Sequence, residues 1–477
     1  MPVPYADPMT EPVCPGCQRR DAEIADLQRR IAELEALVRD LTARLGTNAT
    51  NSGTPPSANP PGAPKPVAKK PTGNRPGGQP GHTAHLRRRL GPERVNRVVR
   101  FIPRRCRRCQ GALPPGAGPD DPAPTWHQVA ELPETAARVT EYQGHYRTCP
   151  GCGALNHAPI PAAVKAHSVG PRLAATLAYL AGCHHVSTRG LEELAEDAFG
   201  VPLALGTVSR LQSQVSEALM AAHAEAVAVV RQAPVKHVDE TGWKLAGKLC
   251  WLWVAATQSV AAFLTHARRG AAGLTALLGE EIRGILCSDR WSAYGRLPVA
   301  QRQVCWAHLV RDFRRCTERG LMGQPVGEAG LRAAEALFRE WHLFRGGGIT
   351  RRALYRRLDP VAAELHEALE RGCGCADAKV AAFCENLLAV APALWRFVVR
   401  EGLEPTNNHA ERLLRRGVLW RKNAFGSASE RGLRFVERLL TVVQTLRLQK
   451  RPVLEFLYQS LVAHRAGLSA PKLLPAG

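Results

Sequence analysis

The chain is short of acidic residues. Its 477 residues contain 64 Lys and Arg against 42 Asp and Glu, which gives a formal net charge of +22. This imbalance favours a polyanionic partner, with nucleic acid the leading one, over a merely solvated basic surface. The sequence also has no uninterrupted run of about 18 apolar residues, so we expect no membrane span. The N-terminal stretch "MPVPYADPMTEPVC" lacks a basic start followed by an apolar segment, so we expect no signal peptide.

A chain kept in a reducing cytoplasm uses Cys-x-x-Cys pairs for metal more often than for disulfides. Of its fourteen Cys, two such pairs lie about forty residues apart in "CRRC" and "CPGC". The four sulfurs, which suit one structural Zn²⁺, belong to Cys106, Cys109, Cys149 and Cys152. The stretches "RVVRFIP" and "ARVTEYQGHYR" around and between the pairs predict strands that form a hairpin. We interpret the Cys at 183, 250, 287, 305, 316, 373, 375 and 384 as scattered or buried thiols.

Apolar residues repeat in heptads between residues 24 and 45: Ile24, Leu27, Ile31, Leu34, Val38, Leu41 and Leu45. β-branched residues at most a positions and Leu at d favour a parallel two-stranded coiled coil. The alternative is an amphipathic helix packed on its own chain. A third pair, Cys14 and Cys17, precedes the heptads, so a dimer would place two copies side by side. An interchain zinc site and an unmetallated pair both remain open.

Residues 51–80 contain nine prolines and no acid, which indicates an extended linker. Residues 61–110 carry fourteen Lys and Arg against one acid, Glu93. Such a basic arm binds a phosphate backbone by releasing counterions. Further on, Leu191 and Leu194 line a predicted helix, Gly200 to Pro202 end it, and a second helix begins near Thr207. This pattern fits a helix-turn-helix, although helical hairpins without DNA contacts are common.

Asp239 and Glu240 in "KHVDETGW" stand next to a predicted strand end. The segments 234–243, 249–258 and 260–267 predict three consecutive strands, followed by a helix, a strand ending at Asp289, and a strand running into a helix. This order is that of a ribonuclease-H-like α/β domain. In that topology Asp239 and Asp289 approach each other, and Glu411, on a helix capped by Thr406 or Asn407, supplies a third carboxylate. Three carboxylates suit two Mg²⁺ (or Mn²⁺) ions about 3.5–4 Å apart. Since strand neighbours face opposite ways, either Asp239 or Glu240 joins them, not both.

Several basic residues accompany this predicted site. His308 and Arg311 lie one helical turn apart, and either could contact the scissile phosphate; a purely structural His308 is the alternative. A basic stretch also follows Glu411: residues 411–451 hold eleven Lys and Arg against three acids. Backbone phosphates of DNA are the expected contacts of Arg415, Arg416, Arg421 and Lys422.

The stretches "HVDETGW", "WLWVAAT", "GILCSDRWSAY", "QVCWAHLVRDF", "NNHAERLLRRGVLWRKNAFGSASERG" and "RPGGQPGH" resemble the insertion sequence 66 family of bacterial transposases, the large DDE subunit. The resemblance covers nearly the whole chain. It implies cleavage and joining of DNA by a DDE triad on a ribonuclease-H-like fold. Carried over, the triad falls on Asp239, Asp289 and Glu411, which favours Asp239 over Glu240. A decayed, non-catalytic DNA-binding copy that acts as a repressor is the competing hypothesis.

The expected architecture is multidomain α/β plus α. The implied partners are double-stranded DNA at the element ends and target, a second copy of the chain in a homodimer or higher oligomer, and accessory proteins of the element. The implied localisation is the bacterial cytoplasm, at the nucleoid. The predicted segments are a tail with Cys-x-x-Cys (1–20), a coiled coil (21–46), a basic linker (47–92), a zinc-binding module (93–165), a helix-turn-helix region (166–230), a catalytic domain in two parts (231–320 and 401–450) around a helical insertion (321–400), and a C-terminal tail (451–477).

Overall fold

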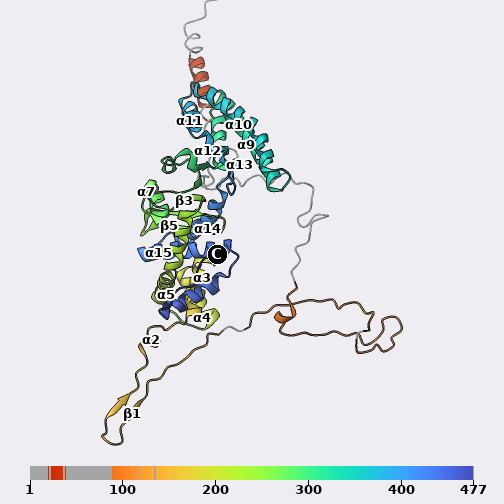
Figure 1. Cartoon of the computed structure of the whole chain (residues 1–477), viewed down its shortest axis with the longest axis vertical. Coiled ribbons are helices and arrows are strands. Elements are labelled where there is room, and N and C mark those ends of the chain that lie inside the picture. Colours follow the sequence, from red (N-terminus) through yellow and green to blue (C-terminus); the bar gives the residue numbers. More distant parts are fainter. Residues whose placement is uncertain are drawn as a thin grey trace, which may run out of the picture.

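The computed structural model describes residues 20, 23–35, 38, 89–116, 118–133 and 136–475. A five-stranded sheet lies at the middle of the molecule, with helices at both ends of its long axis (Figure 1). The strand order is β5-β4-β3-β6-β7. The strands are β3 (Val235–Leu245), β4 (Lys248–Ala256), β5 (Ala261–His266), β6 (Ile285–Ser288) and β7 (Arg302–Val304).

The predicted order of strands and helices is confirmed. β3, β4 and β5 form an antiparallel meander, and α7 (Ala271–Leu278) leads from it to β6. β6 and β7 then join in parallel, and α8 (Trp306–Thr317) follows β7. β6 pairs with residues 235–237 alone, so β3 continues past the end of β6. This leaves the second half of β3 without a strand on that side, and a later helix covers it.

One hydrophobic core joins the sheet to helices from both ends of the sequence. The helices before the sheet are α3 (Pro171–His184), α4 (Thr188–Phe199), α5 (Leu205–Ala218) and α6 (Met220–Gln232), and those after the insertion are α14 (Asn408–Ala424), α15 (Glu430–Leu448) and α16 (Val453–Arg465). The predicted helix-turn-helix pair is present as α4 and α5, but residues 166–230 share the core of the sheet and do not form a separate domain.

The prediction of a C-terminal tail at 451–477 is wrong for most of that segment. It forms α16, which packs against α3 and α5. Phe456, Leu457 and Leu461 are buried there. Their spacing of one, four and five residues is that of one helix face, and this signal was present in the sequence.

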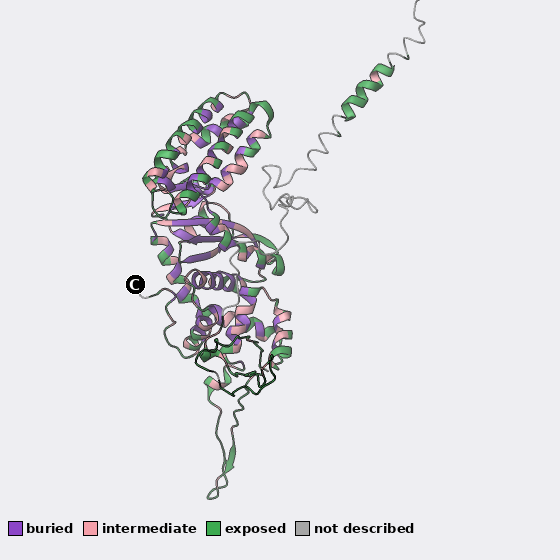
Figure 2. Ribbon diagram, turned by 90° about the vertical axis from the view of Figure 1, so that its right-hand side faces the viewer, coloured by how far each residue is buried: buried purple, intermediate pink, exposed green. Residues whose placement is uncertain are grey.

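The segment 321–400, predicted as a helical insertion, consists of helices that pack around a second hydrophobic core, which also includes α8 and β7. Figure 2 shows its buried residues lying between the packed helices. The helices are α9 (Gln324–Arg345), α10 (Arg351–Cys373), α11 (Ala378–Leu388), α12 (Ala391–Leu394) and α13 (Arg396–Val399). Because α8 and β7 belong to this core, the insertion is tied to the strand end where the predicted site lies.

Helix α15 covers the free edge of β5 with polar side chains. Glu437, Thr441 and Thr445 lie four residues apart on one helix face. They accept hydrogen bonds from the backbone N–H groups of residues 265, 263 and 261, respectively. An exposed strand edge is a template for unwanted pairing, and these side chains take the place of a neighbouring strand.

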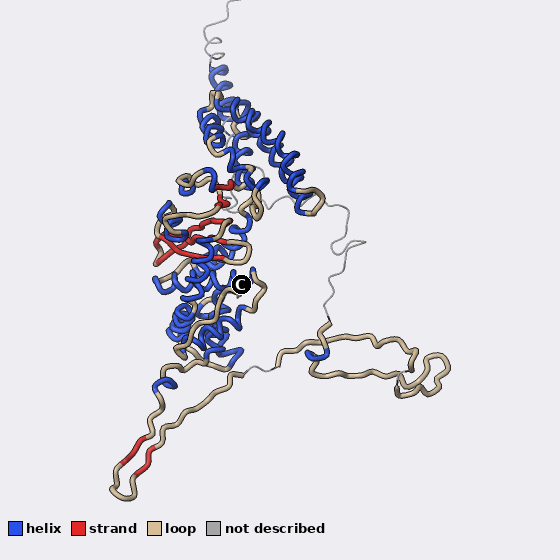
Figure 3. Tube along the Cα trace, viewed as in Figure 1, coloured by secondary structure: helices blue, strands red, loops and turns tan. Residues whose placement is uncertain are grey.

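The described residues between 89 and 165 form extended arms instead of the predicted hairpin module (Figure 3). Two short strands, β1 (Tyr146–Thr148) and β2 (Leu155–His157), pair around the second Cys-x-x-Cys, and the predicted strand at 97–103 is absent. The other elements here are η2 (Pro92–Arg94) and α2 (Ala162–Lys165). The reason is local: few apolar side chains of this segment are covered, and Phe101 is 93% exposed.

Residues 23–35 of the heptad segment are helical. The described apolar positions, Ile24, Leu27, Ile31, Leu34 and Val38, are all at least half exposed. A stripe of this kind is what a coiled-coil seam presents before pairing, so the dimer stays a prediction. Leu41, Leu45, Cys14, Cys17 and most of the basic linker lie outside the described residues. In the described part of the chain, no helix has the length and apolar character needed to cross a bilayer.

Candidate active site

Two of the predicted acids lie side by side where β6 ends and β3 continues. Asp239 is within β3, on the part that extends beyond β6, and Asp289 directly follows Ser288, the last residue of β6. Because β3 and β6 are parallel and His237 pairs with Cys287, each acid comes two residues after a paired position. The two side chains are close enough for the Asp289 carboxylate to raise the pKa of Asp239.

The third acid reaches this edge because the start of α14 is tied to the sheet. Asn407 donates its side-chain N–H to the carbonyl of Val238 at 2.7 Å, and its backbone N–H to Sγ of Cys305 at 3.1 Å. Glu411, one turn into α14, thereby lies beside Asp239. Of the two predicted caps, Thr406 and Asn407, Asn407 occupies the N-cap position, but its side chain makes no capping bond within α14. It holds the helix against β3 instead.

The carboxyl group of Asp239 lies within a cluster of negative charge. Burial raises its pKa well above the ordinary value of 3.8, and repulsion from Glu240, Glu411 and Asp289 raises it further. The opposing influence among the described residues is the backbone N–H of Glu240, which donates to Oδ1 at 3.0 Å. Three acids that raise the pKa of a fourth constitute an electrostatic cost that a cation can remove.

The donor set fits a divalent cation such as Mg²⁺ or Mn²⁺. Hard cations prefer carboxylate oxygens. Oε1 of Glu411 is buried and has no hydrogen-bond partner among the described residues, as a ligand atom would be before the cation binds. Asp239, Asp289 and Glu411 are the residues that could hold it.

The three carboxylates do not form a cage around one ion. Among the described residues, the set of three metal-capable side chains whose ligand atoms all lie within 4.8 Å of one another is Cys305, His308 and Glu411. Asp239 and Asp289 stay outside this set. In a two-metal arrangement the acids divide between two ions about 3.5–4 Å apart, so the predicted pair of ions does not require all three carboxylates to lie in one such set.

Sulfur contributes little to this set. Burial raises the pKa of the Cys305 thiol to about 12, whereas metal ligation needs the thiolate. His308 is more relevant, because its Nδ1 lies 3.6 Å from Oε1 of Glu411. Burial and the nearby Arg311 lower the pKa of His308, against the pull of Glu411. His308 therefore contacts Glu411, a predicted metal ligand, and Arg311 is close enough to His308 to lower its pKa.

Glu240, the alternative to Asp239, is fully engaged elsewhere. Arg269 Nε donates to its Oε1 at 2.9 Å, and the Tyr294 hydroxyl donates to its Oε2 at 2.6 Å. Burial raises its pKa all the same. With both oxygens bonded on the opposite face of β3, Glu240 supports the site from behind and does not compete for a metal.

The predicted DNA contacts on α14 divide into two groups. Arg415 and Lys422 are exposed. Arg416 Nη1 donates to the carbonyl of Cys183 at 3.5 Å, and Arg421 donates to the carbonyl of Gly242. The second group therefore helps to hold α14 on the fold, and its contact with DNA stays a prediction.

Each predicted zinc half-site forms the same local turn. Cys106 donates its N–H to Gly111 and Cys149 donates to Ala154, at 2.9 and 2.8 Å. Backbone N–H groups of the two residues at the far end of each pair lower the pKa of the Cys106 and Cys149 thiols, which favours the thiolate. The structure does not bring the two pairs together: within the described residues, no three of these four sulfurs lie within 4.8 Å of one another.

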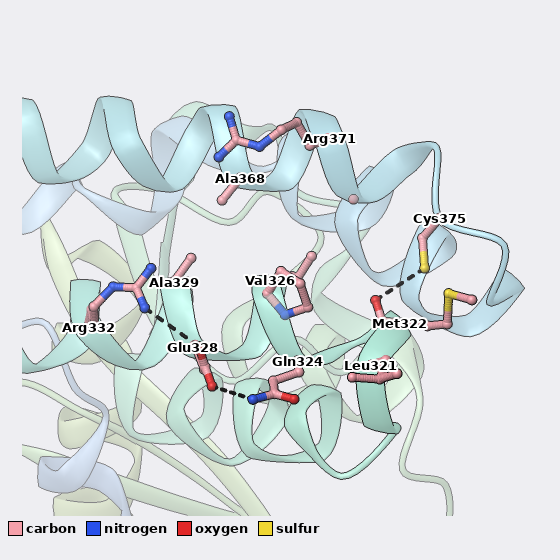
Figure 4. A pocket seen from close by; sticks show the side chains of 12 residues that line it. Leu321, Met322, Gln324, Val326, Glu328, Ala329, Arg332, Ala368, Arg371 and Cys375 are labelled. Atoms are coloured by element: carbon pink, nitrogen blue, oxygen red, sulfur yellow. Dashed lines mark hydrogen bonds and ion pairs between the residues drawn. The ribbon is translucent and has the colours of Figure 1, made fainter.

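A pocket in the helical insertion is lined by none of the three acids. It lies in the insertion between α9 and α10, and its lining includes Val326, Glu328, Arg332 and Cys375 (Figure 4). Gln324 and Arg332 hold the single acid, Glu328, at 2.7 and 3.9 Å. No unsatisfied acid, base or nucleophile converges there, so the pocket is not the reaction site.

Sequence reasoning missed the residues behind Asp239. Arg269 comes from the loop after β5, while Trp291 and Tyr294 come from the loop after β6 and its short helix η3 (Ser292–Tyr294). The motif "SDRWSAYG" places both aromatics close after Asp289, which is the one signal that could have drawn attention to them.

Comparison with known proteins adds a family. A family described as "Transposase IS66 family" matches residues 167–434, and a "Family of unknown function (DUF6444)" matches residues 10–88. Two relatives from Sinorhizobium fredii (strain NBRC 101917 / NGR234) are similar. "Uncharacterized protein y4qI" is 29% identical over 40% of this chain and 38% of its own length. "Uncharacterized protein y4hP" is 25% identical over 74% of this chain and 69% of its own.

Proposed function

Because the chain belongs to the Transposase IS66 family, we propose that it binds the ends of a mobile DNA element and catalyses metal-dependent strand cleavage and strand transfer. The observation that carries this proposal is the convergence of three acids from β3, the end of β6 and α14, with a raised Asp239 pKa and a buried Glu411 oxygen that makes no hydrogen bond. The sheet order and connections agree with a ribonuclease-H-like fold, which supports the same assignment.

In this proposal Asp239, Asp289 and Glu411 hold Mg²⁺ or Mn²⁺. When bound, the ions would activate the attacking water or 3′-hydroxyl and stabilise the leaving oxygen. The chain's own residues do the rest: Asn407 fixes α14 against β3, Glu240 stays bonded to Arg269 and Tyr294 instead of binding metal, and the exposed Arg415 and Lys422 contact DNA phosphates. These contacts orient the duplex without reading its sequence.

Binding requires further parts of the chain. Helices α4 and α5 and the basic segment around residues 61–110 are the proposed DNA-binding elements, which agrees with the net charge of +22. The exposed apolar stripe on residues 23–35 is proposed to pair with a second copy. Accessory proteins of the element and a place at the nucleoid are part of the same proposal.

We expect the full-length chain to nick duplexes that carry the inverted ends of its element, in Mg²⁺ or Mn²⁺ and not in EDTA, and to leave scrambled duplexes largely intact. Asp289→Asn should bind these ends and nick none of them, because one metal ligand loses its charge. Gel-based cleavage and a binding isotherm on the same duplexes measure the two steps. Binding without nicking by the unaltered chain would instead support the non-catalytic repressor.

The zinc module gives a separate prediction. Since both Cys-x-x-Cys turns favour thiolates, we propose that Cys106, Cys109, Cys149 and Cys152 join around one Zn²⁺, and we expect about one zinc per chain by elemental analysis. Cys149→Ser should lose that zinc, whereas Cys373→Ser, a half-buried thiol in the insertion, should keep it. A content of about one and a half would add the interchain Cys14 and Cys17 site; none at all would contradict the module.

A further inference from the structure

The indole of Trp291 is exposed beside the acid cluster. Trp243, Trp253 and Trp306 are fully buried, whereas Trp291 is 39% exposed. Its backbone N–H donates to Oδ1 of Asp289 at 2.9 Å. A single exposed apolar side chain needs no explanation by itself, so its role depends on how the ring is held and on what lies next to it.

The ring is fixed in place by its neighbours. Its Nε1–H donates to the carbonyl of Arg269 at 3.2 Å. The Arg269 guanidinium lies 4.1 Å from the centre of the Trp291 ring and 5.0 Å from that of Trp251. Arg269 is itself fixed by Glu240 at 2.9 Å. A ring that is already immobile loses little side-chain entropy when a ligand stacks on it.

The charge around this ring selects the kind of ligand. The positive charge of Arg269 is already paired with Glu240, so Trp291 and Arg269 together present an exposed indole beside Asp289 and not an unpaired cation. Phosphate oxygens approach the neighbouring acids through metal ions in the proposed reaction. The group that is joined to a phosphate by a short linkage, and that stacks on an indole, is a nucleobase, and such stacking tolerates any base.

We propose that Trp291 stacks on a nucleobase adjacent to the phosphate that is cleaved, and so positions the strand at the acid cluster. This inference rests on the proposed function. It assigns to Trp291 a substrate contact that is independent of base identity, and to Arg269 and Trp251 the support of that ring.

The test compares Trp291→Ala with Trp291→Phe in the full-length chain. On end-containing duplexes in Mg²⁺, the Ala variant should lower kcat/KM for nicking about 5- to 150-fold, the range measured for losing one base–aromatic stack, and the Phe variant should keep most activity. Abasic nucleotides are then placed one at a time on either side of the cleaved phosphate. At one position the unaltered chain should fall to the level of the Ala variant, which should itself be insensitive there.

Trp251→Ala is the matched control, because it also removes a ring from Arg269 but lies away from Asp289. It should remain sensitive to the abasic position. If Trp291→Ala is slower than the unaltered chain by the same factor on intact DNA and on DNA with an abasic nucleotide at each position, Trp291 has a structural role only and the inference is overturned. Full activity of Trp291→Ala would also overturn it. If the unaltered chain neither binds nor nicks the ends, the proposed function fails first; if it nicks and Trp291 shows no base dependence, the stacking inference alone fails.

Discussion

Replacing Asp239 by Asn is expected to abolish nicking and, at the same time, to make the metal-free chain more stable. Loss of the Asp239 carboxylate, a proposed metal ligand, should slow cleavage at least about 1000-fold, because bound ions contribute several kcal/mol to stabilising the transition state. The neutral amide also removes repulsion by Glu240, Glu411 and Asp289. The melting temperature in EDTA should therefore rise, in contrast to most substitutions of buried polar residues.

The pH dependence follows from the direction of the shift. A carboxyl group whose pKa is raised on folding binds more protons in the folded chain, so its contribution to stability is fully present below its ordinary pKa of 3.8 and is lost as the pH rises through the raised value. Asp239→Asn removes this dependence, so its advantage over the unaltered chain should be largest at neutral pH. Added Mg²⁺ should stabilise the unaltered chain more than the variant.

Asp359→Asn, an exposed position on α10, is the matched control for Asp239→Asn. It should leave both nicking and the melting temperature unchanged. A fall in the melting temperature of Asp239→Asn in EDTA would show that the Asp239 carboxylate is held by a stabilising contact, and the interpretation of the acids as a metal site would then be wrong.

The sheet and its acids were predictable because both signals are local. The strand segments, the helix between them and the helix after them can be read from apolar patterns, and they fix the order of elements. Asp289 then comes directly after β6, beside Asp239 within β3. Glu411 is harder, since more than a hundred residues separate it from Asp289. The position of Glu411 beside the sheet depends on the hydrogen bond from Asn407 to Val238, which no sequence pattern predicts.

Other features were beyond the sequence because they depend on contacts between distant segments. Whether Glu240 or Asp239 faces the site is decided by Arg269 and Tyr294, two loop residues that take both Glu240 oxygens. In residues 451–477 the spacing of Phe456, Leu457 and Leu461 does indicate a helix face, but the helices on which that face packs lie about 250 residues earlier. The two Cys-x-x-Cys turns differ from these features because each turn forms from local residues. The sequence does not indicate how the two turns would come together around one metal ion.

The edge of β5 gives the last prediction. Glu437 on α15 accepts hydrogen bonds from the N–H and the hydroxyl of Thr265, and Thr441 accepts one from the N–H of Phe263. Glu437→Ala leaves two buried donors without a partner, so the free energy of unfolding should fall by about 3 kcal/mol; Thr441→Val leaves one and should cost about 1–3 kcal/mol. Denaturant unfolding of the full-length chain measures both.

Glu430→Ala is the control on the same helix, because Glu430 is exposed and its substitution should change the unfolding free energy by less than about 0.5 kcal/mol. A strand edge freed by Glu437→Ala should also make the chain associate through β5 at high concentration. Equal stability of Glu437→Ala and Glu430→Ala would mean that α15 covers the sheet through its apolar face alone. In that case the spacing of Glu437, Thr441 and Thr445 at every fourth residue would add nothing to the stability of the sheet that carries Asp239.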